Sequence, residues 1–199
     1  ILAHEATATG LPPLYEEREV HDTLRLWKSK EYHEPFSLAP YLTCEFRDAG
    51  HMLGSAMMFL DFHGTTMVMT GDLGNSPTPL LRDTESIAGA TYLLMESVYG
   101  NRNHEGIEER KETLRKLIEG TAKENGTLII PVFTIERAQE LLFEMNDLIE
   151  RHHLHPIPIF VDSPLAIKAT EIYRKNTKYF NTTARGYVAH GDDVFRFPR

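Results

Sequence analysis

The sequence has almost no cysteine. Its 199 residues contain only Cys44, which cannot form a disulfide within the chain. A small scaffold stapled by disulfides is therefore excluded, and the composition is typical of a reducing compartment. Long apolar runs are also missing, because the longest are strand-sized segments such as residues 127–133. These runs fall far short of the ~20 residues that cross a bilayer, so no membrane association is expected.

Basic charge is scarce as well. The chain has 21 Lys and Arg against 29 Asp and Glu, for a formal net charge of −8. This balance argues against a protein that coats nucleic acid through bulk positive charge, but it allows an enzyme that binds RNA locally. A basic cluster between residues 168 and 185 is either a phosphate-facing patch or a solvated helix face. The 41% hydrophobic content supports one large or two small packed domains.

The first part of the sequence predicts strands that end in short loops. A helical region is expected over residues 5–30, with an interruption at 10–13. Strands are predicted, in order, at residues 43–48, 56–61, 65–70 and 90–95. The second and third strands are joined by a turn at His63 and Gly64. The last two strands are unbroken apolar runs, a pattern that indicates burial on both faces.

After residue 100 the pattern changes to an alternation of strands and helices. Amphipathic helices are predicted at residues 105–124, 135–153 and 165–175, separated by buried strands at 127–133 and 156–161. Such alternation favours a parallel sheet with crossover helices. The change near residues 101–104 predicts two domains, 1–103 and 104–199.

Three polar residues follow predicted strands: His51, Asp72 and Glu96. Ligands and catalytic groups gather at strand ends, where the loop is variable and its base is rigid. A lone histidine or aspartate in a turn is usually structural, but the pair on neighbouring strands suggests metal ligands. A zinc site needs at least three ligands from the protein, so these two alone do not make one.

These strand-end segments resemble a known family. Segments 48–55 (Asp-Ala-Gly-His-Met-Leu-Gly-Ser) and 70–75 (Thr-Gly-Asp-Leu-Gly-Asn) resemble the third and fourth metal motifs of the metallo-β-lactamase superfamily. Segment 96–102 (Glu-Ser-Val-Tyr-Gly-Asn-Arg) resembles motif A of its β-CASP nucleases. Further matches follow in the family's order at 130–142, 158–166 and 195–198. The sequence is most similar to the RNA-processing branch, which includes bacterial and archaeal β-CASP ribonucleases and the nuclease subunit of the pre-mRNA 3′-end cleavage factor.

The resemblance implies a fold, an activity and a site. The fold would be α/β, part of a metallo-β-lactamase αββα sandwich followed by part of a parallel-sheet β-CASP domain. His51 would bind one zinc, Asp72 would bridge two zincs, and Glu96 would hold a histidine that protonates the leaving group. The reaction would be hydrolysis of RNA phosphodiester bonds by a cytoplasmic enzyme, with a homodimer or a larger RNA-processing complex as its assembly.

The sequence also departs from the family pattern. The His-x-His-x-Asp-His motif is absent, and relatives carry it just before a segment resembling residues 1–7. The motif B and C histidines are absent too. We therefore expect an internal fragment that is inactive alone. A DNA-directed β-CASP nuclease and a non-catalytic β-CASP scaffold subunit are the alternative interpretations.

Four further residues are candidates for substrate binding. Tyr99 and Arg102 would line the RNA cleft by stacking and phosphate pairing, although packing explains Tyr99 equally well. Arg137 either contacts phosphate or organises a helix start, because Glu136 stands before it where many relatives have glycine. Ser163 either contacts substrate or caps the next helix, and we favour the cap.

A group of three histidines, at positions 152, 153 and 155, also invites a metal interpretation. They follow a predicted helix, and the helix dipole favours histidine at that end. We therefore interpret them as structural.

Overall fold

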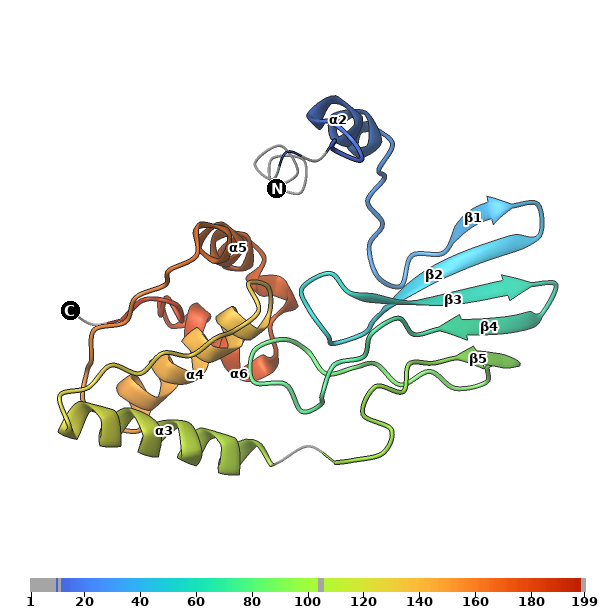
Figure 1. Ribbon diagram of the computed structural model, residues 1–199. Helices are drawn as coiled ribbons and strands as arrows, with labels where there is room; N and C mark the ends of the chain where they lie inside the picture. The colour runs from blue at the N-terminus through green and yellow to red at the C-terminus, as the bar shows by residue number, and fades with distance from the viewer. Residues whose placement is uncertain (1–9, 11, 104–105, 198–199) are drawn as a thin grey trace.

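The computed structural model describes residues 10, 12–103 and 106–197, in two parts that lie side by side (Figure 1). The first part contains helix α2 (Glu17–Arg25) and strands β1 (Phe36–Ala39), β2 (Leu42–Asp48), β3 (Ala56–Phe62), β4 (Thr65–Met69) and β5 (Tyr92–Leu94). The second part contains helices α3 (Ile107–Lys123), α4 (Arg137–Arg151), α5 (Pro164–Lys175) and α6 (Thr182–Ala189), with a 3₁₀ turn, η1 (Thr177–Tyr179). The predicted α/β class is confirmed, while residues 104–105, at the predicted boundary, lie outside the described residues.

The five strands form one sheet in sequence order. Strands β1 to β4 pair antiparallel, and β5 adds parallel to β4. The predicted turn between β3 and β4 is confirmed, with positive φ at both His63 and Gly64, as a two-residue hairpin loop of type I′ requires. Because each antiparallel pairing reverses direction, β2, β4 and β5 run the same way. Their carboxyl ends therefore meet at one edge of the sheet.

Strand β5 is exposed, so the prediction of a buried strand at residues 90–95 is wrong in this respect. Tyr92, Leu93 and Leu94 are 61%, 60% and 56% exposed. The strand pairs with β4 through only three residues, and no other described strand adjoins it. An apolar run predicts a strand, but its burial depends on what lies against the strand.

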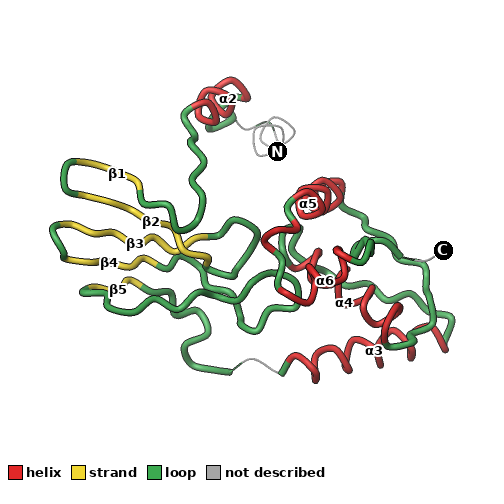
Figure 2. Tube along the Cα trace, turned by 180° about the vertical axis from the view of Figure 1, so that it is seen from behind, coloured by secondary structure: helices red, strands yellow, loops and turns green. Residues whose placement is uncertain are grey.

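The strands predicted at residues 127–133 and 156–161 are not formed among the described residues, and neither is the parallel sheet expected there. Both segments run as loops (Figure 2), and Ile129 and Phe160 are 83% and 88% exposed. A strand requires a hydrogen-bonding partner, and apolar composition alone does not supply one. The helices α3, α4 and α5 agree with the prediction, whereas β1 and α6 were not predicted.

Two hydrophobic clusters form the core of the second part. One surrounds Ile118 of α3 and Leu148 of α4. The other contains Phe143 and Phe180, and it also takes in Leu80 and Leu81 from the first part. Leu80 is fully buried, and its carbonyl oxygen accepts a hydrogen bond from the amide of Asn181 at 2.9 Å. Residues 76–85, here called the clamp segment, therefore fasten the two parts together.

Helix α2 lies apart from the rest of the described chain (Figure 1). It has no buried residue, and Leu24 within it and Trp27 just after it are 50% and 74% exposed. The helix predicted before residue 10 falls outside the described residues. Within the described portion, no helix has the length and apolarity needed to cross a membrane.

Candidate active site

The three strand-end residues converge at one edge of the sheet. His51 follows β2, Asp72 follows β4 and Glu96 follows β5, and these three strands run in the same direction. His51 Nε2 lies 3.8 Å from Asp72 Oδ2. Glu96 Oε1 accepts a hydrogen bond from the Leu73 amide at 2.6 Å. Residues separated by more than twenty positions in sequence are thus brought into one cluster.

Two glycines allow the loops after β2 and β4 to touch. A Cβ on Gly74 would lie 1.8 Å from the carbonyl oxygen of Gly50, and a Cβ on Gly50 would lie 2.6 Å from the Thr84 amide. Gly50 also has φ +62°, a conformation that residues with a side chain rarely adopt. The Gly74 amide donates to the carbonyl oxygen of Ala49 at 2.9 Å. This close approach is what sets His51 opposite Asp72.

The loop that carries His51, residues 49–55, is organised by its own hydrogen bonds. Ser55 Oγ accepts from the amides of His51 and Met52 at 3.1 and 3.2 Å. Asp48 Oδ1 accepts from the Gly50 amide at 2.9 Å. Burial raises the pKa of Asp48, and the Gly50 hydrogen bond opposes that rise. We call residues 49–55 the His51 loop.

Glu96 is held at both its backbone and its side chain. Its amide donates to Thr70 Oγ1 at 3.3 Å, while its carboxylate accepts from Leu73, the residue after Asp72. The Thr70 amide in turn donates to the carbonyl oxygen of Leu94 in β5. These bonds fix the Glu96 carboxylate beside the loop that carries Asp72.

The pair of His51 and Asp72 fits part of a zinc site. Imidazole nitrogen and carboxylate oxygen are both zinc ligands, and the Asp72 side chain is 73% exposed, so packing does not occupy it. In the group of three histidines, His152 Nε2 lies 3.3 Å from Asp147 Oδ2 and 3.1 Å from Lys111 Nζ. Among the residues that the structure describes, no three His, Cys, Asp or Glu side chains form a group able to hold a metal ion.

A pocket of about 750 Å³ opens at the junction of the two parts. Asn75 and Tyr99 line it from the first part, each three residues beyond a strand-end carboxylate. Arg110, Phe133 and Arg137 line it from the second part. The pocket therefore combines aromatic, apolar and cationic surface next to the loops of the candidate site.

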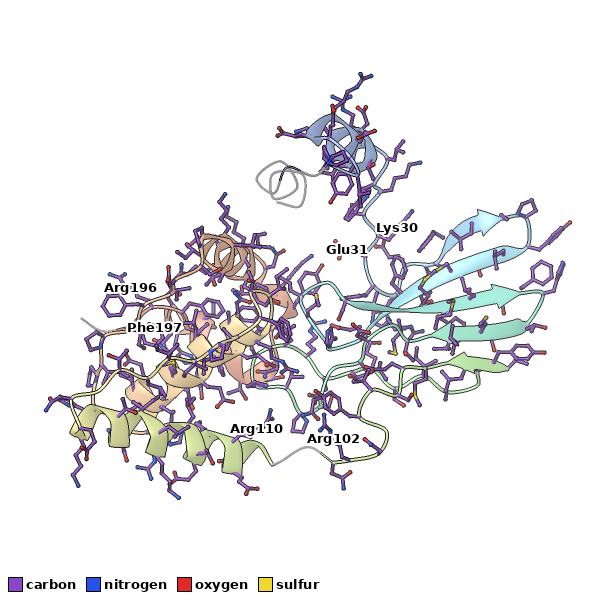
Figure 3. All side chains as sticks on the ribbon, in the orientation of Figure 1. Lys30, Glu31, Arg102, Arg110, Arg196 and Phe197 are labelled. Atoms are coloured by element: carbon purple, nitrogen blue, oxygen red, sulfur yellow. The ribbon has the colours of Figure 1, made fainter. Side chains whose placement is uncertain are left out.

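The arginines around this pocket differ in their pairing. Arg137 Nη1 lies 2.5 Å from Glu140 Oε2, whereas the buried Arg110 Nε has no hydrogen-bond partner among the described residues. The Arg102 guanidinium lies over the Tyr99 ring at 4.7 Å. Figure 3 shows Arg110 near the start of α3 and Arg102 on the loop that precedes this helix. Cationic groups from both parts are thus near the pocket.

Comparison with known proteins identifies the family of this chain. The model of the Beta-Casp domain matches residues 138–199. The chain belongs to the β-CASP family. It is 32% identical to a ribonuclease of Thermus thermophilus over 98% of this chain and 45% of the relative.

Other relatives are archaeal and eukaryotic. An RNase J-like protein of Methanocaldococcus jannaschii is 34% identical over 94% of this chain and 45% of its own length. The cleavage and polyadenylation specificity factor 73 of Drosophila melanogaster is 30% identical over 92% of this chain and 27% of its own length. The chain spans less than half the length of these curated relatives.

Within this β-CASP chain, two of the four candidate substrate residues line the pocket. Tyr99 and Arg137 do so, while Arg102 contacts the Tyr99 ring from outside the lining. Ser163 is the N-cap of α5, and its hydroxyl accepts from the Ala166 amide at 3.2 Å, so the favoured interpretation as a cap is confirmed. Arg137 pairs with Glu140 in the first turn of α4, as expected if it organises the start of this helix.

Sequence reasoning missed Arg110, Tyr173 and the burial of Glu136. Arg110 and Tyr173 lie on predicted helices and carried no signal of their own. Glu136 was visible as a departure from the family pattern, because it replaces a frequent glycine. The structure explains the frequent glycine at this position, because Glu136 has φ +66°, a conformation that glycine adopts more easily.

Proposed function

We propose that this β-CASP chain is the central portion of a zinc-dependent nuclease that hydrolyses RNA phosphodiester bonds. Residues 1–103 would belong to its metallo-β-lactamase domain and residues 104–199 to its β-CASP domain. The observation that carries the proposal is the convergence of His51, Asp72 and Glu96 at one edge of the sheet. A histidine and a carboxylate that face each other at 3.8 Å can share a metal ion, because imidazole nitrogen and carboxylate oxygen are both zinc ligands.

Two zinc ions would occupy the complete site. His51 would bind one of them and Asp72 would bridge both, while the other ligands would come from residues other than those described here. A two-metal centre supplies a hydroxide at neutral pH and stabilises the attacking and leaving oxygens of a phosphodiester. Glu96, fixed by the Leu73 amide, would orient a histidine that protonates the leaving oxygen.

The pocket at the junction would hold the RNA strand. Stacking of a base on an aromatic ring tolerates any sequence, and Tyr99 is 47% exposed at the pocket wall. Arg102 and Arg110 would pair with phosphates, which offsets the overall negative charge of the chain locally. The names of two relatives, a ribonuclease and an RNase J-like protein, favour RNA over DNA as the substrate.

The proposal predicts zinc-dependent cleavage of RNA by the full-length protein, with His51 and Asp72 essential. We expect His51→Ala and Asp72→Asn to lower zinc affinity by more than about 100-fold, beyond the 10–100-fold typical of residues that only support a ligand. Zinc content after dialysis, measured by elemental analysis, and cleavage of matched RNA and DNA strands would be determined together. His63→Ala is the matched control, because His63 lies in the exposed β3–β4 turn.

The outcomes of this experiment distinguish the RNA nuclease from a DNA nuclease and from a scaffold subunit. Cleavage of DNA in preference to RNA would replace the proposed substrate, and zinc binding without cleavage would favour a scaffold subunit. The chain of 199 residues alone is expected to hold well below one zinc and to cleave neither strand. If it retains two zincs that His51→Ala removes, residues within these 199 must complete the site themselves.

A further inference from the structure

Glu136 occupies a strained turn immediately before α4. Its φ and ψ are +66° and −62°, and the Arg137 amide donates to the carbonyl oxygen of Ile135 at 2.9 Å. This is a three-residue γ-turn with positive φ, a conformation that is rare for a residue with a side chain. Glycine would adopt it more easily. Strain of this kind persists where the surroundings hold the residue in place, and it clusters at functional sites.

The side chain of Glu136 is buried and bonded across the fold. Glu136 is 4% exposed, and its carboxylate accepts a hydrogen bond from the Tyr173 hydroxyl at 2.5 Å. Tyr173, on α5, is itself 2% exposed. Its hydroxyl oxygen accepts from the Leu53 amide at 3.2 Å. The hydrogen bonds therefore run from the His51 loop, through α5, to the start of α4.

These hydrogen bonds reach the His51 loop, which carries the candidate metal ligand. Leu53 lies two residues after His51, and its side chain packs against the cluster that contains Leu80 and Tyr173. The other hydrogen bonds of the loop come from within it, to Ser55 Oγ, or from the first part of the chain, where the Tyr32 hydroxyl donates to the Ser55 carbonyl oxygen at 2.8 Å and the Gly74 amide to that of Ala49. The Tyr173 hydroxyl is thus a fixed point for this loop that the second part of the chain supplies.

We propose that Glu136 and Tyr173 are positioning residues, which hold the His51 loop in its ligand-presenting conformation from the β-CASP side of the junction. The inference rests on the proposed zinc site, because it concerns the affinity of that site. Neither residue would touch the metal or the RNA. The buried carboxylate is retained in a strained turn because its oxygen orients the Tyr173 hydroxyl, whose own oxygen then faces the Leu53 amide.

The test compares three variants of the full-length protein. Tyr173→Phe removes the hydroxyl, and Glu136→Gly removes the carboxylate while relieving the turn. Glu136→Gln keeps an oxygen that accepts from Tyr173. We expect the first two to weaken zinc binding about 10-fold or more, as supporting groups of metal ligands do, and Glu136→Gln to stay within about twofold of the unchanged protein.

Two measurements separate positioning from a loss of folding. Zinc affinity is measured by competition with a chromophoric chelator, and hydrogen exchange of residues 49–55 is followed by mass spectrometry on the metal-free protein. The matched control is Tyr187→Phe, because Tyr187 packs against the same cluster from α6. In Tyr173→Phe, exchange should rise in the His51 loop while the core of α4 keeps its protection.

The outcomes distinguish this inference from the function on which it rests. If the unchanged protein binds zinc and both Tyr173→Phe and Glu136→Gly bind it equally well, the positioning role is overturned and the proposed function stands. If weaker binding appears only together with faster exchange throughout the protein, the role is structural and the inference is wrong. If the unchanged protein binds no zinc, the proposed function fails. The inference then fails as a statement about metal affinity, whatever the loop exchange shows.

Discussion

Glu136 combines two features that folded proteins usually avoid, a strained backbone and a buried carboxylate. A γ-turn with positive φ costs on the order of 1–3 kcal/mol. Burial adds a second cost, and it raises the pKa of Glu136 from 4.5 to about 7. Glu140 raises it further, while the Tyr173 hydrogen bond, Arg137 and the Leu53 amide oppose the rise. The residue therefore changes its charge close to neutral pH.

This pKa shift predicts a pH-dependent stability. The pKa of Glu136 is higher in the folded protein than in the unfolded chain, so the folded state binds the proton more tightly. The resulting stabilisation is complete below about pH 4.5 and is lost as the pH rises through about 7. Since one pKa unit corresponds to about 1.4 kcal/mol, the loss between pH 5 and pH 8 is about 2–3 kcal/mol.

Glu136→Gln is the reference for this prediction, because glutamine does not titrate. Urea unfolding of both proteins at pH 5, 6, 7 and 8 gives the difference in their free energies of unfolding, in which other titrating groups cancel. We expect the free energy of unfolding of the unchanged protein to fall relative to that of Glu136→Gln as the pH rises. A constant difference across the four pH values would show that Glu136 does not titrate in this range.

Helix α5 illustrates how local signals define the start of an element. Ser163 caps it through the Ala166 amide, and Pro164 occupies the first helical position, where the missing amide hydrogen has no cost. We expect Ser163→Ala to lower the free energy of unfolding by about 1 kcal/mol, whereas Ser163→Asp retains an acceptor and most of the stability. Denaturant unfolding of the two variants measures this. Equal losses in both would mean that the hydroxyl has a role other than the cap.

The elements predicted from sequence are those whose signal is local. The helices α3, α4 and α5 carry their own apolar faces, α5 also has its own cap, and the β3–β4 hairpin carries its own turn residues, so each was found close to its observed bounds. Residues 127–133 carry the composition of a strand, but pairing depends on a distant segment that composition does not identify. The prediction that β5 is buried was wrong for a related reason, because burial also depends on distant segments.

The candidate site divides in the same way. His51, Asp72 and Glu96 were found because each follows a strand and matches a family motif. Their proximity required the strand directions, which the sheet supplies. The bond between Tyr173 and Leu53 joins residues 120 positions apart, and neither has an unusual residue type or neighbour in the sequence. Only the fold brings such a pair together.

The clamp segment makes the two parts of the chain depend on each other. It extends from the first part, yet Leu80 and Leu81 are buried among α4, α6 and the chain that joins α5 to α6. Asn181 Nδ2 donates to the carbonyl oxygens of Thr78 and Pro79, each at 3.0 Å. The same hydrophobic cluster receives Leu53 of the His51 loop. Apolar burial and the candidate metal site therefore share one junction.

Truncating Leu80 should loosen this junction as a whole. Leu80 is fully buried, so Leu80→Ala is expected to cost about 2–5 kcal/mol through lost burial and the cavity it leaves. Leu117→Ala is the matched control, because Leu117 is 52% exposed on α3 and its truncation should cost no more than about 0.5 kcal/mol. Urea unfolding measures both values.

Hydrogen exchange then shows how far the effect of Leu80→Ala extends. Because the clamp segment, the start of α6 and the His51 loop meet in one cluster, protection should fall in all three, at residues 76–85, 181–189 and 49–55. Strands β2 and β3 should keep theirs, since their seven-residue antiparallel pairing lies within the first part. Faster exchange confined to residues 76–85 would contradict a shared junction. It would mean that the His51 loop is held by hydrogen bonds within itself and to the first part of the chain, with no contribution from the β-CASP side.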